Sequence, residues 1–189
     1  MRRAAWGWAS GGAFLLLAAW ARGGLQPIDG PVMAVTQSLP AIALRASIAV
    51  SSTAVIAACG LFLAWFFRRD LRLLPLVVVI GLVPVIERAL KLLIHRARPT
   101  GIGLGFPSGH AMASLTLVML IGGAAWPVLR PRGKVWAALL AGLFELIVAV
   151  GLMGQRAHWL SDILGGWAAA GAYACWMLPF IRSPRAAPV

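Results

Sequence analysis

Long hydrophobic runs separated by short polar segments dominate the chain. Six of these runs cover approximately residues 4–21, 48–67, 73–95, 108–129, 135–153 and 159–181. A transmembrane helix needs ~20 predominantly apolar residues, and each run reaches or approaches that length. The pattern therefore predicts an all-α, polytopic membrane protein with six transmembrane helices in one bundle.

The first run and the segment that follows it leave alternatives open. The Ala-Trp-Ala tripeptide at residues 19–21 resembles the cleavage site of a signal peptide, whereas Trp6 and Trp8 favour a retained helix. Residues 23–47 contain Pro27, Pro31 and Pro40, which predict a loop with a short helix on the membrane surface.

Composition agrees with the membrane interpretation. Hydrophobic residues make up 61% of the chain and charged residues only 12%, about half the share in soluble domains. We expect residues 1–189 to form a single membrane-embedded domain. The net charge of +12 does not indicate nucleic-acid binding, because the basic residues lie in short clusters between the apolar runs, where they orient membrane proteins.

Those basic clusters predict an orientation. With six spans, most of them fall on one side, which the positive-inside rule makes cytoplasmic. The clusters on that side are Arg2-Arg3, Arg68-Arg69 with Arg72, Arg130-Arg132-Lys134, and Arg182 with Arg185. The opposite side keeps a separate set of charges near the three histidines, and these need another explanation.

The third run ends in the first candidate site segment. Lys91 and Arg98 are seven residues apart, so a helix places them on one face, with Glu87 one turn before Lys91. Pro99 disfavours helix at the residue before it, so the helix should end near Arg98. Snorkelling charges are the simple alternative, but Lys91 lies inside the apolar run, where charges are usually functional.

The second candidate segment opens the fourth run. Ser108 is a natural N-cap, and the free amides that follow it, together with the helix dipole, form a site for an anion. Gly109 lets a ligand approach the backbone closely. His110 then lies in the first turn, beside any bound anion.

The third candidate segment pairs an imidazole with an acid. His158 and Asp162 are four residues apart and within reach of each other. A carboxylate on one imidazole nitrogen fixes the tautomer and leaves the other nitrogen free to attack. With six spans, all three segments fall on the non-cytoplasmic side, and together they supply the cations, amides, nucleophile and proton donor of phosphoryl transfer.

Taken in order, the three segments resemble the motifs of the type 2 phosphatidic acid phosphatase superfamily. Lys91 through Arg98-Pro99 matches the first motif, Pro107 through His110 the second, and His158 and Asp162 part of the third. The resemblance implies a six-helix, metal-independent phosphatase without a cofactor. His158 would be the nucleophile and form a phosphohistidine, Asp162 would orient it, and His110 would protonate the leaving group. The implied phosphate-binding groups are Lys91, Arg98, Ser108 and the Gly109 amide.

One departure from the family pattern concerns the third motif. The family has Ser-Arg where this chain has Gly151 and Leu152, and an arginine occurs instead at Arg156. If the backbone were helical there, Leu152 and Arg156 would share a face, so we hypothesise that Arg156 supplies the missing phosphate-binding cation. The alternative is that Arg156 is a surface charge.

The other acids receive simpler interpretations. We expect Asp29 and Asp70 to be loop charges, Glu87 to pair with Lys91 or Arg88, and Glu145 to have a buried partner.

We expect the protein to lie in the bacterial inner membrane and to act on a lipid phosphate. Its site should face the periplasm or the outside. The short loop between Arg98 and Pro107 leaves the site little covered, which favours a substrate that enters from the bilayer. We favour undecaprenyl diphosphate, with phosphatidic acid, phosphatidylglycerol phosphate and lipid A phosphates as alternatives. A lipid phosphotransferase and a non-catalytic phospholipid-binding or transport relative also fit the sequence. The sequence does not determine the oligomeric state.

Overall fold

The computed structural model describes residues 2–69 and 71–182, so Asp70 and Arg185 lie outside the described residues. The regular elements in these ranges are helices, joined by short turns and two isolated β-bridges. They are α1 (Arg2–Ala21), α2 (Asp29–Gln37), α3 (Ala41–Val50), α4 (Thr53–Phe66), α5 (Leu73–Ile94), α6 (Gly109–Ala125), α7 (Pro131–Gly154) and α8 (Leu160–Ile181). The all-α prediction is confirmed.

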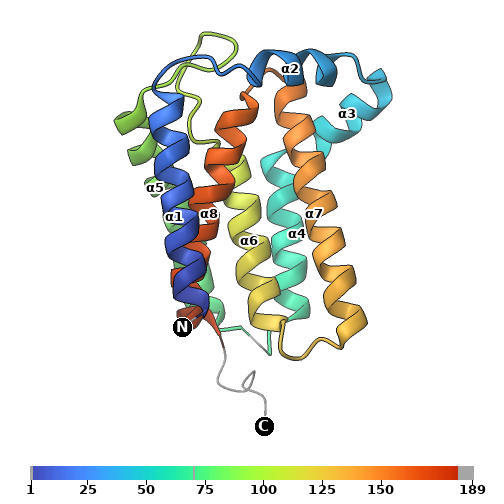
Figure 1. The fold of residues 1–189 in the computed structure, drawn as a ribbon. Coiled ribbons are helices and arrows are strands. Elements are labelled where there is room, and N and C mark those ends of the chain that lie inside the picture. Colours follow the sequence, from blue (N-terminus) through green and yellow to red (C-terminus); the bar gives the residue numbers. More distant parts are fainter. Residues whose placement is uncertain (1, 70, 183–189) are drawn as a thin grey trace.

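Helix α6 lies at the centre of the bundle. It contacts α4, α5, α7 and α8, while α1 packs along α8 on the outside. Figure 1 shows α4, α6, α7 and α8 running side by side along the length of the molecule. An apolar surface on all sides suits a helix with neighbours all round, and Leu120, Ile121 and Ala124 of α6 are fully buried.

The hydrophobic runs locate most helices within a few residues, and the second run is the exception. It was expected to be continuous over residues 48–67, but the chain turns at Ser51 and Ser52, between α3 and α4. Ser52 caps α4 by accepting a hydrogen bond from the Val55 amide. Helix-capping chemistry, which competes with helix continuation at serine, therefore overrides the apolar run.

Helix length and hydropathy identify fewer transmembrane helices than the six that the sequence predicts. In the described ranges, four helices are long and apolar enough to cross a membrane: α1, α5, α7 and α8. The count becomes five if α2 and α3, which meet at a bend of 113°, form one broken span. Helices α4 and α6 have 14 and 17 residues, fewer than the ~20 residues of a typical span. A count based on helix length alone is therefore lower than the six spans predicted from the sequence.

Helices α2 and α3 lie at one end of the bundle, above α7 (Figure 1). The closest approach is at Gly151 of α7, where a Cβ atom would lie 2.2 Å from the Ser47 carbonyl oxygen of α3. Because backbone cannot yield as a flexible side chain does, residue 151 has no room for a side chain. Glycine at position 151 therefore allows α3 to pack closely on α7.

Replacing Gly151 with alanine should push α3 away from α7. Overpacking of this kind costs about 1–3 kcal/mol, so we expect the thermal unfolding midpoint in detergent to fall by several degrees. Gly142→Ala is the matched control, since it lies on the same helix with nothing within 4 Å of its Cβ position. Equal midpoints for the two variants would show that the α3–α7 contact is not tight.

Candidate active site

A compact loop between α5 and α6 positions the first cation. Helix α5 ends at Ile94, and the capping residue His95 has a left-handed φ of 57°. The chain then folds back, with the Arg98 amide donating to the Gly103 carbonyl at 3.2 Å and the Arg98 Nε donating to the Leu104 carbonyl at 3.1 Å. Both Gly101 and Gly103 have positive φ, which glycine adopts without strain. The loop thereby holds the Arg98 side chain at the bundle end.

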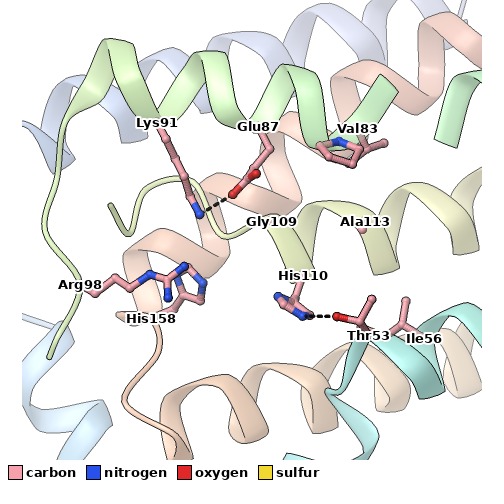
Figure 2. A pocket seen from close by; sticks show the side chains of 11 residues that line it. Thr53, Ile56, Val83, Glu87, Lys91, Arg98, Gly109, His110, Ala113 and His158 are labelled. Carbon is pink, nitrogen blue, oxygen red and sulfur yellow. Dashed lines mark hydrogen bonds and ion pairs between the residues drawn. The ribbon is translucent and has the colours of Figure 1, made fainter. Parts of the chain in front are cut away.

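A cavity of about 320 Å³ lies where α4, α5 and α6 meet this loop. Figure 2 shows charged side chains and His158 at one end of it, and Val83, Ala113 and Ile56 at the other. The three predicted segments contribute together to this one cavity, whose lining includes Lys91, Arg98, Gly109, His110 and His158.

Lys91 and Glu87 form an ion pair inside the cavity. Both side chains are largely buried, and the pair has the i, i+4 spacing expected on one face of α5. The Glu87 carboxylate also lies against the backbone of Gly109, where a Cβ would be 2.7 Å from Oε1. A larger residue at 109 would therefore displace Glu87. With glycine at this position, α5 and the start of α6 can lie in close contact.

The start of α6 has the predicted capped geometry. The Ser108 hydroxyl is fully buried and accepts a long hydrogen bond of 3.5 Å from the Ala111 amide, so the side chain acts as the N-cap and does not line the cavity. Gly109 and His110 do line it. The His110 Nε2 lies 2.9 Å from the hydroxyl of Thr53 on α4, a contact that orients the imidazole (Figure 2).

His158 and Asp162 are neighbours, but their side chains do not form a hydrogen bond. The Nδ1–Oδ2 distance is 3.6 Å, and the buried Nδ1 has no hydrogen-bond partner. Asp162 is held instead by the Trp159 amide at 2.9 Å and by Arg96 at 2.8 Å. Burial lowers the pKa of His158 because it desolvates the imidazolium, while the nearby Asp162 carboxylate opposes that shift. His158 is therefore neutral near pH 7.

Arg156 lies outside the cavity lining. Helix α7 ends at Gly154, Arg156 takes a left-handed φ of 53°, and its side chain is exposed. The shared helical face that motivated the hypothesis is therefore absent. Leu152, at the family's arginine position, is buried in an apolar cluster with Met33 and Val148. Whether Arg156 contacts phosphate stays a prediction.

Three further residues at or beside the site were not predicted, namely Thr53, Asp29 and Arg96. Thr53 lies inside the second apolar run and carried no sequence signal. Asp29, expected to be a loop charge, is instead fully buried and paired with Arg96, because α2 packs onto the start of α8. The sequence feature that could have drawn attention to Asp29 is the small number of acidic residues. The whole chain has only five, and a charged residue near a membrane usually has a function.

Two remaining expectations concern acids and metals. Glu145 does have buried partners, the Ser114 hydroxyl at 3.0 Å and the Trp167 indole at 2.8 Å. Within residues 2–69 and 71–182, no group of three or more His, Cys, Asp or Glu side chains is arranged to hold a metal ion.

Comparisons with known proteins identify the family. A model of the PAP2 superfamily matches residues 72–185, more than half of the chain, whereas no curated protein matches the sequence. The fold is similar to the crystal structure described as the first transmembrane PAP2 type phosphatidylglycerolphosphate phosphatase from Bacillus subtilis. That match has a TM-score of 0.72 and 19% identity, and covers 93% of this chain and 94% of the other. At this identity the similarity establishes the fold, and the family model establishes that this chain belongs to the PAP2 superfamily.

Proposed function

We propose that the protein is an integral-membrane lipid phosphatase that works through a phosphohistidine. The observation that carries this proposal is the single cavity that contains Lys91, Arg98, Gly109, His110 and His158. Two cations and a helix N-terminus suit the equatorial oxygens of a transferring phosphoryl group. Two imidazoles supply a nucleophile and an acid without a metal ligand set.

In the first step, a nitrogen of neutral His158 attacks phosphorus. A P–N bond forms, the P–O bond to the leaving group breaks, and His110 gives its proton to the leaving oxygen. The positive charge that develops on His158 is stabilised by the Asp162 carboxylate, which lies 3.6 Å from Nδ1.

In the second step, water attacks the phosphohistidine. His110, now neutral, takes a proton from the water as the P–O bond forms, and the P–N bond breaks. Inorganic phosphate leaves, His158 returns to its neutral form, and His110 is again protonated. Lys91 and Arg98 hold the phosphoryl oxygens throughout both steps.

We propose six membrane crossings, made by α1 and by α4 through α8. Support comes from the packing, because α6 contacts α4, α5, α7 and α8 and runs beside them in Figure 1. The loops rich in arginine and lysine then lie at the end opposite the cavity, which the positive-inside rule assigns to the cytoplasm. The cavity would open at the outer face of the bacterial inner membrane.

The shape of the cavity supports a lipid substrate. Val83 precedes Lys91 on α5 by about two helical turns, about 12 Å, and lies towards the middle of the bundle. The apolar end of the cavity formed by Val83, Ile56 and Ala113 (Figure 2) suits the first carbons of a lipid chain. Undecaprenyl diphosphate remains our first candidate. Phosphatidylglycerol phosphate is the second, favoured by the fold of the Bacillus subtilis phosphatase.

The first test is a panel of lipid phosphates and diphosphates assayed with purified protein and His158→Ala. We expect phosphate release from at least one lipid in excess chelator, and a loss of about 10³-fold or more without the nucleophile. Brief incubation with lipid labelled in its terminal phosphate should label the unmodified protein through an acid-labile bond. Chelator-sensitive turnover, or an active His158→Ala protein, would contradict the mechanism.

Removing the Lys91 charge should weaken transition-state stabilisation. We expect Lys91→Met to lower kcat by about 100-fold, the usual cost of losing one such contact. Arg88→Met removes an exposed cation of the same helix outside the cavity and should change kcat less than about twofold. Similar losses for both variants would point to a general effect of charge at this membrane boundary.

The pH dependence should report a nucleophile with a lowered pKa. His158 must be neutral to attack, and burial lowers its pKa below 6.5. Activity should therefore persist below pH 6.5 and fall only as pH drops through the lowered pKa. The measurement is kcat/KM against pH, corrected for the separately titrated ionisation of the substrate. A corrected acid limb above 6.5 would refute the expectation.

A further inference from the structure

A buried chain of charges lies directly behind the cavity. Arg96 donates from Nη1 to Asp162 at 2.8 Å and from Nη2 to Asp29 at 2.6 Å. Both carboxylates have no exposed surface, and the arginine side chain is 5% exposed. These three charged residues thus join the start of α2, the loop after α5 and the start of α8.

Asp29 is the most completely bonded member. Its oxygens accept from Arg96, from the Ser161 backbone amide at 2.9 Å, from the Ser161 hydroxyl, which lies 2.7 and 2.8 Å from the two oxygens, and from the Gln26 backbone amide at 3.2 Å. Every one of these partners is a donor, so the site is built for an ionised carboxylate. Asp29 itself does not line the cavity.

Stability alone is a weak reason for such an arrangement. Replacing buried ion pairs with apolar residues is often neutral or stabilising, because desolvation of the charges offsets their attraction. A membrane bundle surrounded by lipid has even less reason to place three charges in its interior. Because this group of three charges lies beside His158, it can also influence the nucleophile.

That use follows from the balance of charge. Alone, the Arg96–Asp162 pair would be neutral, so the arginine would cancel the effect of Asp162 on His158. With Asp29 on the far side of the guanidinium, two carboxylates face one cation and the group keeps one net negative charge. Asp162 can then be held rigidly by Arg96 and still act on the imidazole as an anion.

We propose that Asp29 is a positioning residue for the nucleophile: through Arg96 it fixes the Asp162 carboxylate and preserves a net negative charge beside His158. The consequence for catalysis rests on the proposed function, in which His158 gains positive charge as it is phosphorylated. The surface helix α2, which begins at Asp29, thereby becomes part of the active-site structure.

The other ionisable groups around His158 stay constant in the test of this proposal. They come from three elements packed around the cavity, namely α5, the loop that follows it, and α6. These groups are Glu87, Lys91, Arg98 and His110.

The test measures the titration of His158 directly. The chain has three histidines, so ¹⁵N-histidine labelling of the whole protein in detergent micelles gives few imidazole signals, and His158→Ala assigns the relevant one. Asp29→Asn removes one negative charge and should lower the midpoint by about 0.5–1 pH unit. The double variant Asp29→Asn/Arg96→Gln restores one net negative charge and should return the midpoint to within about 0.2 pH unit of the unmodified protein.

A purely structural role predicts the opposite order, because the double variant loses more hydrogen bonds than the single one. A midpoint unchanged in Asp29→Asn, or lower still in the double variant, overturns the proposal. Ser161→Ala removes hydrogen bonds to Asp29 without changing charge, and its shift should be less than half that of Asp29→Asn. If Asp29→Asn does not fold, the double variant decides alone, since a midpoint clearly below that of the unmodified protein overturns the proposal.

Kinetics separate this proposal from the proposed function. With farnesyl diphosphate in micelles, Asp29→Asn should lower kcat by about 10-fold with little change in KM, and the double variant should recover most of the loss. If the midpoints shift as expected but His158→Ala still releases phosphate, the charge coupling stands and the phosphohistidine mechanism fails. If His158→Ala is inactive and the midpoints do not move, only the role of Asp29 fails.

Discussion

Charged groups at the edge of a bilayer need partners, and the active end of this bundle is built around that constraint. Lys91 pairs with Glu87, Arg98 donates to a loop carbonyl, and Arg96 lies between two carboxylates. Each of these three cations is thereby held by polar contacts within the protein. Such contacts fix the side chains before any substrate binds, and preorganised charge is what stabilises a phosphoryl transition state.

Close packing converts this set of pairs into a site. The small residue at Gly109 lets the Glu87 carboxylate lie against the first turn of α6, which brings Lys91 towards His110. At Gly151 the same device seats α3 on α7, at the position where the family motif has a serine. Leu152, at the position of the motif arginine, likewise serves helix packing, in the apolar cluster that includes Met33 of α2.

Much of the fold could be predicted because it depends on local sequence. Apolar runs locate helices, and Ser108 marks the start of α6, since both effects act within one or two turns of chain. The break at Ser51 and Ser52 was missed because long apolar stretches continue on both sides of these two serines. Asp29 was missed for a different reason: its partner Ser161 lies 132 residues away, and nothing near Asp29 in the sequence indicates that contact. Arg156 does not line the cavity. The hypothesis for this residue assumed that α7 continues past Gly154, where the helix ends.

The charge of the cavity bears on which lipids can bind. Lys91 and Arg98 face the Glu87 carboxylate and the net negative charge of the Asp29–Arg96–Asp162 group, so these charges nearly balance and the surplus is the positive charge that the proposed mechanism places on His110. Attraction of an anion by net charge alone is then modest, and in the proposed mechanism binding depends on geometry: Lys91 would exchange Glu87 for a phosphate oxygen while the α6 N-terminus and Arg98 would take others. The proposed lipid substrate would also place its chain in the apolar end of the cavity near Val83 and Ala113. Free phosphate would gain only the polar contacts, so we expect the product to bind more weakly than the lipid.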